Sequence, residues 1–274
     1  MLKIIIMALL IFAGMVGYDT MVDKPVPTAP DQKQEEKINR HEKSAVMAIF
    51  TSLLPPRETW PSPVQKFYLA FNMETVIDPI RQNPQWTPLK SMSQDIPRAL
   101  IAIEDHDFYN HGAIAVDGVL RALLVNISAG EVVQGGSTIT QQFIKNVFLT
   151  HEQSMERKIE EAVLSLMLED NYTKDEILEL YLNTTYFGAG ANGINQAAKT
   201  YFGKAPSALT LAEAAVIASL PYAPSALNPL ENPQQCKQRQ QLVLAAMHKY
   251  GMINQSQLAE AKAEHIRLAN GTRI

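Results

Sequence analysis

Apolar residues recur at helical spacing along most of this chain, whereas the strict alternation of apolar and polar residues that marks β-strands is nearly absent. Capping residues precede several of the apolar stretches: Ser93–Asp95 before the first, and Thr173 ahead of an acidic turn. The pattern therefore predicts a mostly α fold. The helices that we expect beyond Thr87 cover Ile96–Ile103, Ala115–Ile127, Met155–Leu168, Ile177–Leu182, Gly193–Tyr201, Ala214–Leu220, Arg239–His248 and Gln255–Leu268.

The N-terminus predicts a membrane anchor. Lys3 is followed by Ile4–Val16, an uninterrupted run of apolar residues and glycine, which is typical of a signal sequence or a signal anchor. The run is shorter than the roughly 20 residues of an ordinary transmembrane helix. Because no clean cleavage site follows it, we favour an uncleaved anchor over a cleaved signal. We assign residues 1–18 to this anchor, 19–43 to a proline-rich charged tether, 44–86 to an ordered N-terminal extension and 87–270 to the main domain.

The composition argues against several classes of function. The chain has 274 residues and a formal net charge of −4, so it presents no broad basic field for nucleic acid. Cys236 is the single cysteine, which rules out an internal disulfide. Its polar surroundings predict a surface or half-buried thiol rather than a nucleophile. No group of cysteine and histidine residues has the spacing of a zinc site.

Acidic residues and histidines cluster in Ile103–His111, which reads IEDHDFYNH. Glu104, Asp105 and Asp107 follow directly after the apolar run Ala99–Ile103. Charged residues at the exit of a core segment are usually solvated or paired, but such clusters also form catalytic sites. On this stretch alone, a solvated helix end is the favoured interpretation.

A second group of polar residues follows a glycine pair in Gln134–Asn146. Thr138, Gln142 and Lys145 fall at i, i+4 and i+7, which places them on one face of a helix. The apolar residues between them form an adjacent core face. A polar face without acids, near a helix N-terminus and ending in a lysine, suits a phosphate-bearing ligand. An ordinary amphipathic helix is the alternative.

The predicted helix Met155–Leu168 carries a charge pair. Arg157 and Glu161 are four residues apart, and they form either a surface ion pair or a carboxylate that an arginine orients at a site. Other apolar residues of the helix are expected to point into a core; they are Ile159, Val163 and Leu166.

Five motifs together resemble the peptidoglycan glycosyltransferase family, whose domain occurs alone in monofunctional transglycosylases and as the first half of class A penicillin-binding proteins. The resemblance covers roughly residues 86–268. It implies a lysozyme-like, bilobed helical glycosyltransferase domain behind the N-terminal anchor. The chain departs from the family at Ala113 and Ala115, where glycine and aspartate are usual. The motifs are EDHDFYNH at 104–111, GGSTITQQFIKN at 135–146, RKIEEA at 157–162, ILELYLN with YFGAG at 177–190, and LTLAEAA with LPYAP at 209–224.

The resemblance implies specific roles for residues of these motifs. Glu104 is implied to be the general base, and Glu161 the second catalytic carboxylate near the diphosphate of the donor. Lys145 and Arg157 are implied to contact phosphate oxygens. Further implied positions bind substrate (Ser137, Thr138, Gln142 and Asn146) or shape the first motif (Asp105, Phe108 and His111).

The implied reaction joins lipid-linked disaccharides into a glycan. Lipid II is the acceptor, the growing glycan on undecaprenyl diphosphate is the donor, and Glu104 would take the proton of the acceptor 4-hydroxyl while the anomeric carbon inverts from α to β. No cofactor and no protein metal site are expected, although a divalent cation could lie near the diphosphate. The implied partners are these substrates, the bacterial cytoplasmic membrane and other cell-wall synthesis proteins. The domain would lie on the outer or periplasmic side of a single-pass anchor, with Phe148 and Leu149 in the membrane surface.

Two other functions stay open. A lysozyme-like hydrolase or lytic transglycosylase would use an acid at the same place, but it would not need Lys145 and Arg157 for a diphosphate. A catalytically silent, membrane-anchored scaffold would bind lipid II or proteins without turnover, and the presence of both predicted catalytic acids argues against it. Since the sequence ends at Ile274, no penicillin-binding transpeptidase half is expected.

Overall fold

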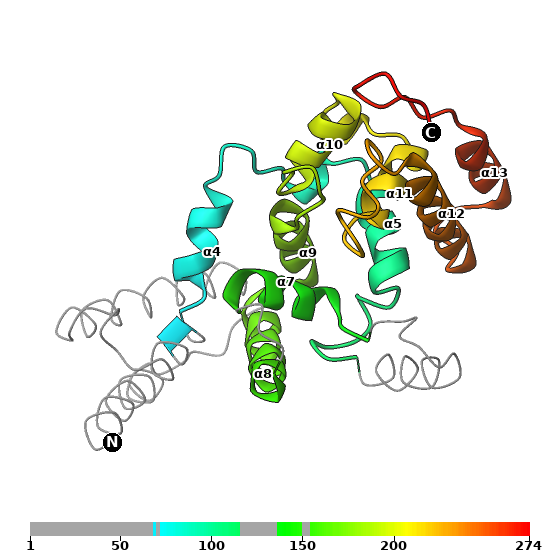
Figure 1. Ribbon diagram of the computed structural model, residues 1–274. Coiled ribbons are helices and arrows are strands. Elements are labelled where there is room, and N and C mark those ends of the chain that lie inside the picture. Colours follow the sequence, from blue (N-terminus) through cyan, green and yellow to red (C-terminus); the bar gives the residue numbers. More distant parts are fainter. Residues whose placement is uncertain (1–67, 70–71, 116–135, 150–153) are drawn as a thin grey trace, which may run out of the picture. The chain divides into compact units, whose positions relative to one another are not determined.

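The computed structural model describes residues 68–69, 72–115, 136–149 and 154–274 (Figure 1). The predicted anchor, the tether and residues 116–127 of an expected helix lie outside these ranges. The chain divides into two compact units, residues 1–77 and 78–274. In the described part of the first unit, helix α4 (Glu74–Arg81), which continues into the second unit, begins just after Asn72, whose side chain donates to the Tyr68 carbonyl at 2.9 Å.

The second unit is helical along its described residues, which form no strand and carry two isolated β-bridges instead. The predicted mostly α class is confirmed. No helix in the described ranges is long and apolar enough to cross a membrane. The α-helices are α5 (Asp95–Glu104), α7 (Ile139–Phe148), α8 (Met155–Asn171), α9 (Lys174–Thr184), α10 (Ile194–Phe202), α11 (Leu211–Ser219), α12 (Pro233–Lys249) and α13 (Gln255–Ala263), and two 3₁₀ turns are η2 (Leu89–Ser91) and η3 (Pro206–Ala208).

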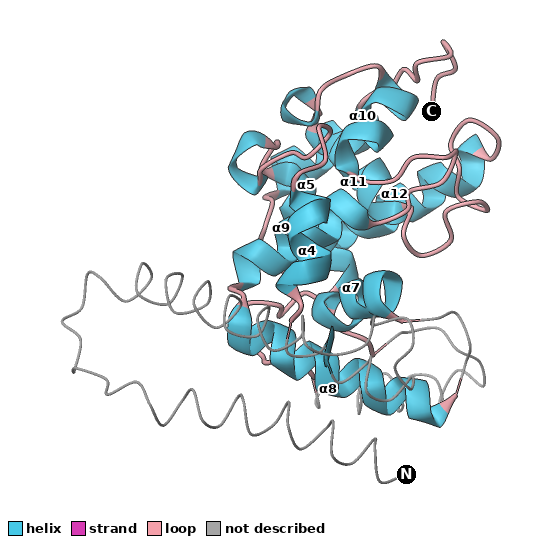
Figure 2. Ribbon diagram, turned by 90° about the vertical axis from the view of Figure 1, so that its left-hand side faces the viewer, coloured by secondary structure: helices cyan, strands magenta, loops and turns pink. Residues whose placement is uncertain are grey.

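Helix α11 is the centre of the larger group of helices. Every residue from Ala212 to Ser219 is buried, because the segment packs against α5 and α12 at once. These three helices lie side by side in both ribbon views (Figures 1 and 2), and α10 and α13 pack at their edge. The packing holds α5 firmly and thereby fixes its C-terminal residue, Glu104.

A second group consists of α7, α8 and α9. Helix α7 packs against both of the others and lies between them. Of its predicted core face, Ile139 and Phe143 are fully buried, whereas Val147 is only partly buried; Ile144 is fully buried as well. Among the polar residues of α7, Gln142 reaches Glu104 at the end of α5, whereas the buried Thr140 donates to Glu169 on α8.

Side-chain caps fix where four helices begin. Thr138, Thr173, Thr210 and Asn254 each accept a hydrogen bond from the backbone of the third helical residue, and the glutamine or glutamate at that position bonds back to the cap. This reciprocal arrangement satisfies two backbone donors that would otherwise be free. Helix α5 differs from the prediction, because Gln94 occupies its N-cap and makes no side-chain hydrogen bond there.

The prediction that the apolar residues Ile159, Val163 and Leu166 of α8 point into a core is wrong. Their side chains are 61%, 49% and 55% exposed, and they form one continuous apolar face that we call the α8 stripe. Single exposed apolar residues are common, but a row of three on one helix face is a candidate contact surface.

The opposite face of α8 is the buried one. It carries Glu161, Ser165 and Leu168, all of which are almost inaccessible. Both faces have i, i+4, i+7 spacing, and hydrophobic periodicity favours the Ile, Val and Leu of the stripe as the core face, whereas the structure buries the other face. Burial of the acidic face is tolerated because Arg157 and Lys158 both pair with the Glu161 carboxylate.

Cys236 is fully buried in α12, contrary to the predicted surface or half-buried position. It shares the inward face of that helix with Gln240, Val243 and Met247, which are also buried. The polar residues around it in the sequence lie on the other faces of the helix. Burial raises the pKa of the thiol to about 11, so the thiol stays protonated at neutral pH.

Candidate active site

Glu104 lies where the two groups of helices meet. Its Oε2 accepts a hydrogen bond from Nε2 of Gln142 on α7 at 2.9 Å. Burial, the largest influence, raises the pKa of Glu104 above its usual value, and the charge of Asp105 acts in the same direction. The Gln142 bond and the charges of Arg239 and Lys145 oppose the rise. A carboxylate that is partly withdrawn from water and held by one donor is well suited to accept a proton.

Helix α9 supports Gln142 from behind. Tyr181 Oη donates to Oε1 of Gln142 at 3.0 Å, and the tyrosine side chain is buried. The hydroxyl reaches α7 because α9 packs directly against that helix. A chain of hydrogen bonds therefore runs from Tyr181 through Gln142 to Glu104.

Asp105 fastens the loop after α5 to the N-terminus of α7. Its Oδ2 accepts from the backbone nitrogen of Ile139 at 3.0 Å, and its Oδ1 lies 2.6 Å from Nε2 of His111. The other ring nitrogen of His111 faces the carbonyl oxygen of Gly112. Phe108 is fully buried beneath the same loop. These contacts define the path of the loop, while the family roles implied for the three residues stay predictions.

The residues of the polar face that was predicted for α7 differ in their burial and in their hydrogen-bond partners. Thr138 is the buried N-cap: its hydroxyl donates to the Ala113 carbonyl at 2.7 Å and accepts from the Gln141 backbone at 3.1 Å. The hydroxyl hydrogen is thus already used within the protein. Ser137 is more accessible, and its Oγ accepts a hydrogen bond from Lys158 at 3.2 Å.

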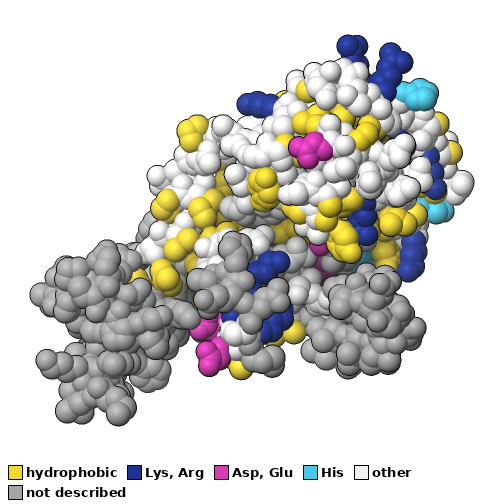
Figure 3. Space-filling view, viewed as in Figure 1, with side chains coloured by type: hydrophobic (Ala, Val, Ile, Leu, Met, Phe, Trp, Pro, Cys, Tyr) yellow, Lys and Arg dark blue, Asp and Glu magenta, His cyan; other side chains and the backbone are white. Residues whose placement is uncertain are grey.

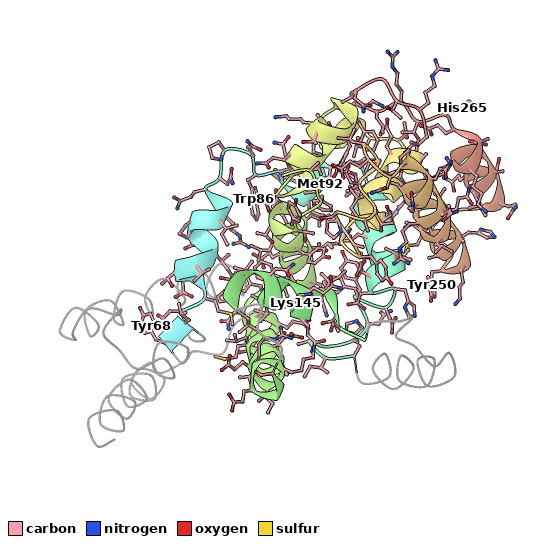
Figure 4. The ribbon with its side chains drawn as sticks, in the orientation of Figure 1. Tyr68, Trp86, Met92, Lys145, Tyr250 and His265 are labelled. Carbon is pink, nitrogen blue, oxygen red and sulfur yellow. The ribbon has the colours of Figure 1, made fainter. Side chains whose placement is uncertain are left out.

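Lys145 and Asn146 lie in the last turns of α7 and are exposed. Neither side chain has a hydrogen-bond or ion-pair partner among the residues that the structure describes. Lys145 projects from α7 in Figure 4, and basic side chains gather over α7 and α8 in the space-filling view (Figure 3). An accessible ammonium whose charge reaches Glu104 can bind an anionic ligand beside that carboxylate.

The first turns of α8 present two more cations. Nη1 of Arg157 lies 3.3 Å from Oε2 of the buried Glu161, and Nζ of Lys158 pairs with its Oε1. Nε of Arg157 is buried without a partner among the described residues. Both groups lie at the helix N-terminus, where the backbone dipole also favours negative charge. Because Glu161 is buried, the pair is not the surface ion pair of the first interpretation, while a role for Arg157 in orienting Glu161 at a site stays a prediction.

Sequence reasoning missed Lys158 and Tyr181 as parts of this site. Sequence spacing could have identified Lys158, because a lysine three residues before Glu161 lies on the same helix face. Tyr181 carries no such local signal. Its role depends on the packing of α9 against α7, which brings its hydroxyl to Gln142.

Arg239 and Tyr222 were also missed. Arg239 lies on α12, and its charge lowers the pKa of Glu104. The guanidinium carbon is 4.2 Å from the ring centroid of Tyr222, whose side chain is largely exposed. Both residues are remote from Glu104 in the sequence, and the packing of α12 against α5 brings Arg239 to it.

The arrangement combines a proton acceptor from the first group of helices with cations from both groups, Arg239 from α12 and the others from α7 and α8. Within the described ranges no three His, Cys, Asp or Glu side chains converge as metal ligands. The chemistry that these residues can perform themselves is proton removal beside a bound anion.

Comparisons with known proteins identify relatives over most of the chain. The family described as "Transglycosylase" matches residues 64–248. A protein of Cupriavidus necator named "Putative transglycosylase H16_A0665" is 45% identical over 188 residues, which cover 69% of this chain and 81% of that protein.

Penicillin-binding proteins are also similar to the chain. "Penicillin-binding protein 1A" of Aquifex aeolicus is 45% identical over 176 residues, which cover 64% of this chain and 24% of that protein. "Penicillin-binding protein 2D" of Bacillus subtilis is 45% identical over 175 residues, covering 64% and 25%. The chain thus spans about a quarter of the length of these relatives. The crystal structure of penicillin-binding protein 1A from Haemophilus influenzae aligns at 33% identity with a TM-score of 0.34, over 48% of this chain and 16% of that one.

Proposed function

The chain belongs to the transglycosylase family and is a peptidoglycan glycosyltransferase, and we propose that it polymerises lipid II into glycan strands. One observation carries the proposal: Glu104 is partly buried, accepts a hydrogen bond from Gln142 at 2.9 Å, and has its pKa lowered by the charges of Arg239 and Lys145. A proton acceptor beside cations is what transfer from a diphosphate leaving group needs.

In the proposed reaction, Glu104 removes the proton from the 4-hydroxyl of a lipid II acceptor as that oxygen attacks the anomeric carbon of the lipid-linked chain. The bond from the anomeric carbon to the diphosphate oxygen breaks with its electron pair, the configuration inverts from α to β, and undecaprenyl diphosphate leaves. General-base assistance of this kind contributes typically about 10²–10⁴-fold.

Positive side chains stabilise the departing diphosphate in this proposal. Lys145 and Arg157 bind its oxygens, which is supported by the accessibility of Lys145 and by the place of Arg157 at the start of α8. Glu161, the second predicted catalytic carboxylate, acts by holding Arg157 and Lys158, because both of its oxygens are already paired. No cofactor is required, and a divalent cation bound to the diphosphate itself is compatible with this arrangement.

The remaining predicted binding residues differ in what they can offer a ligand. Gln142 already donates to Glu104 and accepts from Tyr181, so it can bind substrate only in addition to these two hydrogen bonds. The exposed Asn146 and the accessible Ser137 are better placed to donate to a sugar or phosphate group. Thr138 supports the substrate site through the capping of α7.

We further propose that the membrane meets the protein at α8. Both substrates are lipid-linked in the proposed reaction, so the site must work at a bilayer surface. The α8 stripe is an exposed apolar face on the helix that also carries Arg157. Phe148 and Leu149 are partly exposed where α7 ends, and they can extend the same contact. The proposed location is the outer face of the bacterial cytoplasmic membrane, alongside other cell-wall synthesis proteins.

The test is polymerisation of purified lipid II by the wild-type protein and by Glu104→Gln. We expect glycan from the wild type and a loss of at least about 100-fold in the variant, the lower range of general-base catalysis. Near-normal glycan synthesis by Glu104→Gln would overturn the base assignment. Muropeptides released from purified cell wall would favour a lytic enzyme instead, and binding of lipid II without turnover would favour a scaffold.

A further inference from the structure

The hydroxyl of Tyr181 ends against a residue of the proposed site, although the tyrosine itself is buried within the second group of helices. It donates to Oε1 of Gln142 at 3.0 Å, and Nε2 of the same amide donates to Glu104 at 2.9 Å. We propose that Tyr181 is a positioning residue that holds the Gln142 amide with its NH₂ group, rather than its carbonyl, toward Glu104. The inference deepens the proposed function and rests on Glu104 being the base.

Either end of the Gln142 side-chain amide could face Glu104. The two ends of the Gln142 side chain have nearly the same size, so packing alone does not distinguish its two orientations. With the carbonyl toward Glu104, the ionised carboxylate would face an acceptor, and only the protonated acid could bond to it. With the NH₂ toward Glu104, the ionised form is favoured. The orientation of the amide therefore affects how readily Glu104 is available as a base.

Tyr181 can bias this choice because it offers a donor at a fixed place. Its side chain is buried, and α9 packs along α7. A buried carbonyl that loses its donor is destabilised, because it has also given up its hydrogen bonds to water. While the hydroxyl donates to Oε1 of Gln142, the NH₂ end of the amide faces Glu104, and the reverse orientation would leave the hydroxyl hydrogen without this acceptor. Phenylalanine at position 181 would keep the packing and remove the anchor.

Other charged groups also act on Glu104, and they set the background for a test. Arg239 faces it from α12, Lys145 from α7, and Asp105 follows it in the chain. None of these groups changes in a Tyr181→Phe variant. A shift in the titration of Glu104 in that variant would therefore come from the amide of Gln142.

The experiment compares the full-length proteins carrying Tyr181→Phe, Gln142→Met, and both substitutions together. Tyr201→Phe is the matched control, because Tyr201 is equally buried and donates its hydroxyl to the Phe187 carbonyl at 2.8 Å, away from Glu104. The measurements are kcat and KM for lipid II from pH 5 to 9. A second measurement, which does not need activity, is the ¹³C-NMR titration of the Glu104 carboxyl, assigned with Glu104→Gln.

We expect Tyr181→Phe to lower kcat at pH 7 by roughly fivefold, the equivalent of one hydrogen bond, with little change in KM. The acidic limb of the rate profile and the NMR titration of Glu104 should both move to higher pH. In the Gln142→Met background the same substitution should have almost no further effect. Tyr201→Phe should move neither curve.

Three results would overturn the inference: an equal effect of Tyr181→Phe with and without Gln142, an unmoved titration of Glu104, or the same behaviour in Tyr201→Phe. Failure of the proposed function looks different. In that case the wild type makes no glycan from lipid II. The NMR titration of Glu104 in Tyr181→Phe still shows, independently of activity, whether the hydroxyl acts on that carboxyl.

Discussion

Replacement of Glu161 by glutamine tests the ion pair at the start of α8. The substitution keeps the shape of the side chain and removes the charge between Arg157 and Lys158. Loss of one partner from a fully buried pair costs about 3–5 kcal/mol, whereas an exposed pair contributes about 0–1 kcal/mol. The Arg157 side chain is 18% exposed and that of Lys158 is 44% exposed, so both cations regain part of their hydration.

The expected loss of stability therefore lies between the two limits, at about 2 kcal/mol, most of it from Arg157. For a domain of this size such a loss lowers Tm by about 4–8 °C. We also expect a separate effect on substrate binding. With the carboxylate gone, Arg157 and Lys158 are no longer held in place, so the KM for the lipid-linked donor should rise about tenfold, which corresponds to about 1.4 kcal/mol.

Glu213→Gln is the matched control for this experiment. Glu213 is also buried and pairs with a partly exposed lysine, Lys204, at 2.7 Å, but it lies at the start of α11. It should lose comparable stability and leave the KM for the donor unchanged. Thermal unfolding and initial rates of lipid II polymerisation measure the two effects. A wild-type KM in Glu161→Gln, or an equal rise of KM in Glu213→Gln, would show that Glu161 does not hold Arg157 and Lys158 for donor binding.

Two further predictions concern Glu104 and the α8 stripe. Burial raises the pKa of Glu104 above 4.5 in the folded protein, so the wild type loses stability as the pH rises through that pKa, and Glu104→Gln should be more stable than the wild type at pH 7.5 but not below about pH 4.5. Urea unfolding at both pH values checks this, and an equal gain at both would contradict it. Val163→Lys with Leu166→Lys should weaken binding to anionic liposomes roughly tenfold, although lysine adds positive charge, because the apolar contact is lost. Leu242→Lys, at a similarly exposed site on α12, should not weaken it, and equal binding by all the variants in a sedimentation assay would contradict the stripe as the membrane contact.

Local sequence signals predicted the parts of the site that depend on one helix. The glycine pair before Ser137 predicts a helix that starts at that serine, and α7 begins two residues later, with Thr138 as its N-cap, because capping is a property of a few neighbouring residues. The apolar spacing also placed Glu104 at the end of a buried helix. The motif resemblance then selected Glu104 from the acids around it, which spacing alone could not do.

The same local sequence signals could not predict contacts between helices. The two faces of α8 have equal spacing, and the choice between them depends on whether Glu161 finds cations to neutralise it. Arg239 approaches Glu104 only because α12 packs on α5. Such contacts between helices depend on tertiary structure, and hydrophobic periodicity in a single sequence does not predict them.

The bonds of Asp105 have a consequence for the temperature dependence of catalysis. Because this carboxylate already ties the loop after Glu104 to α7, at 3.0 Å from the Ile139 nitrogen, we expect that Glu104, the proposed base, does not have to be brought into place when substrate binds. Folding, rather than binding, supplies the ordering entropy of that part of the site. The activation barrier should therefore contain little reorganisation at the base, and mutations that loosen Asp105 should appear first as a more negative activation entropy.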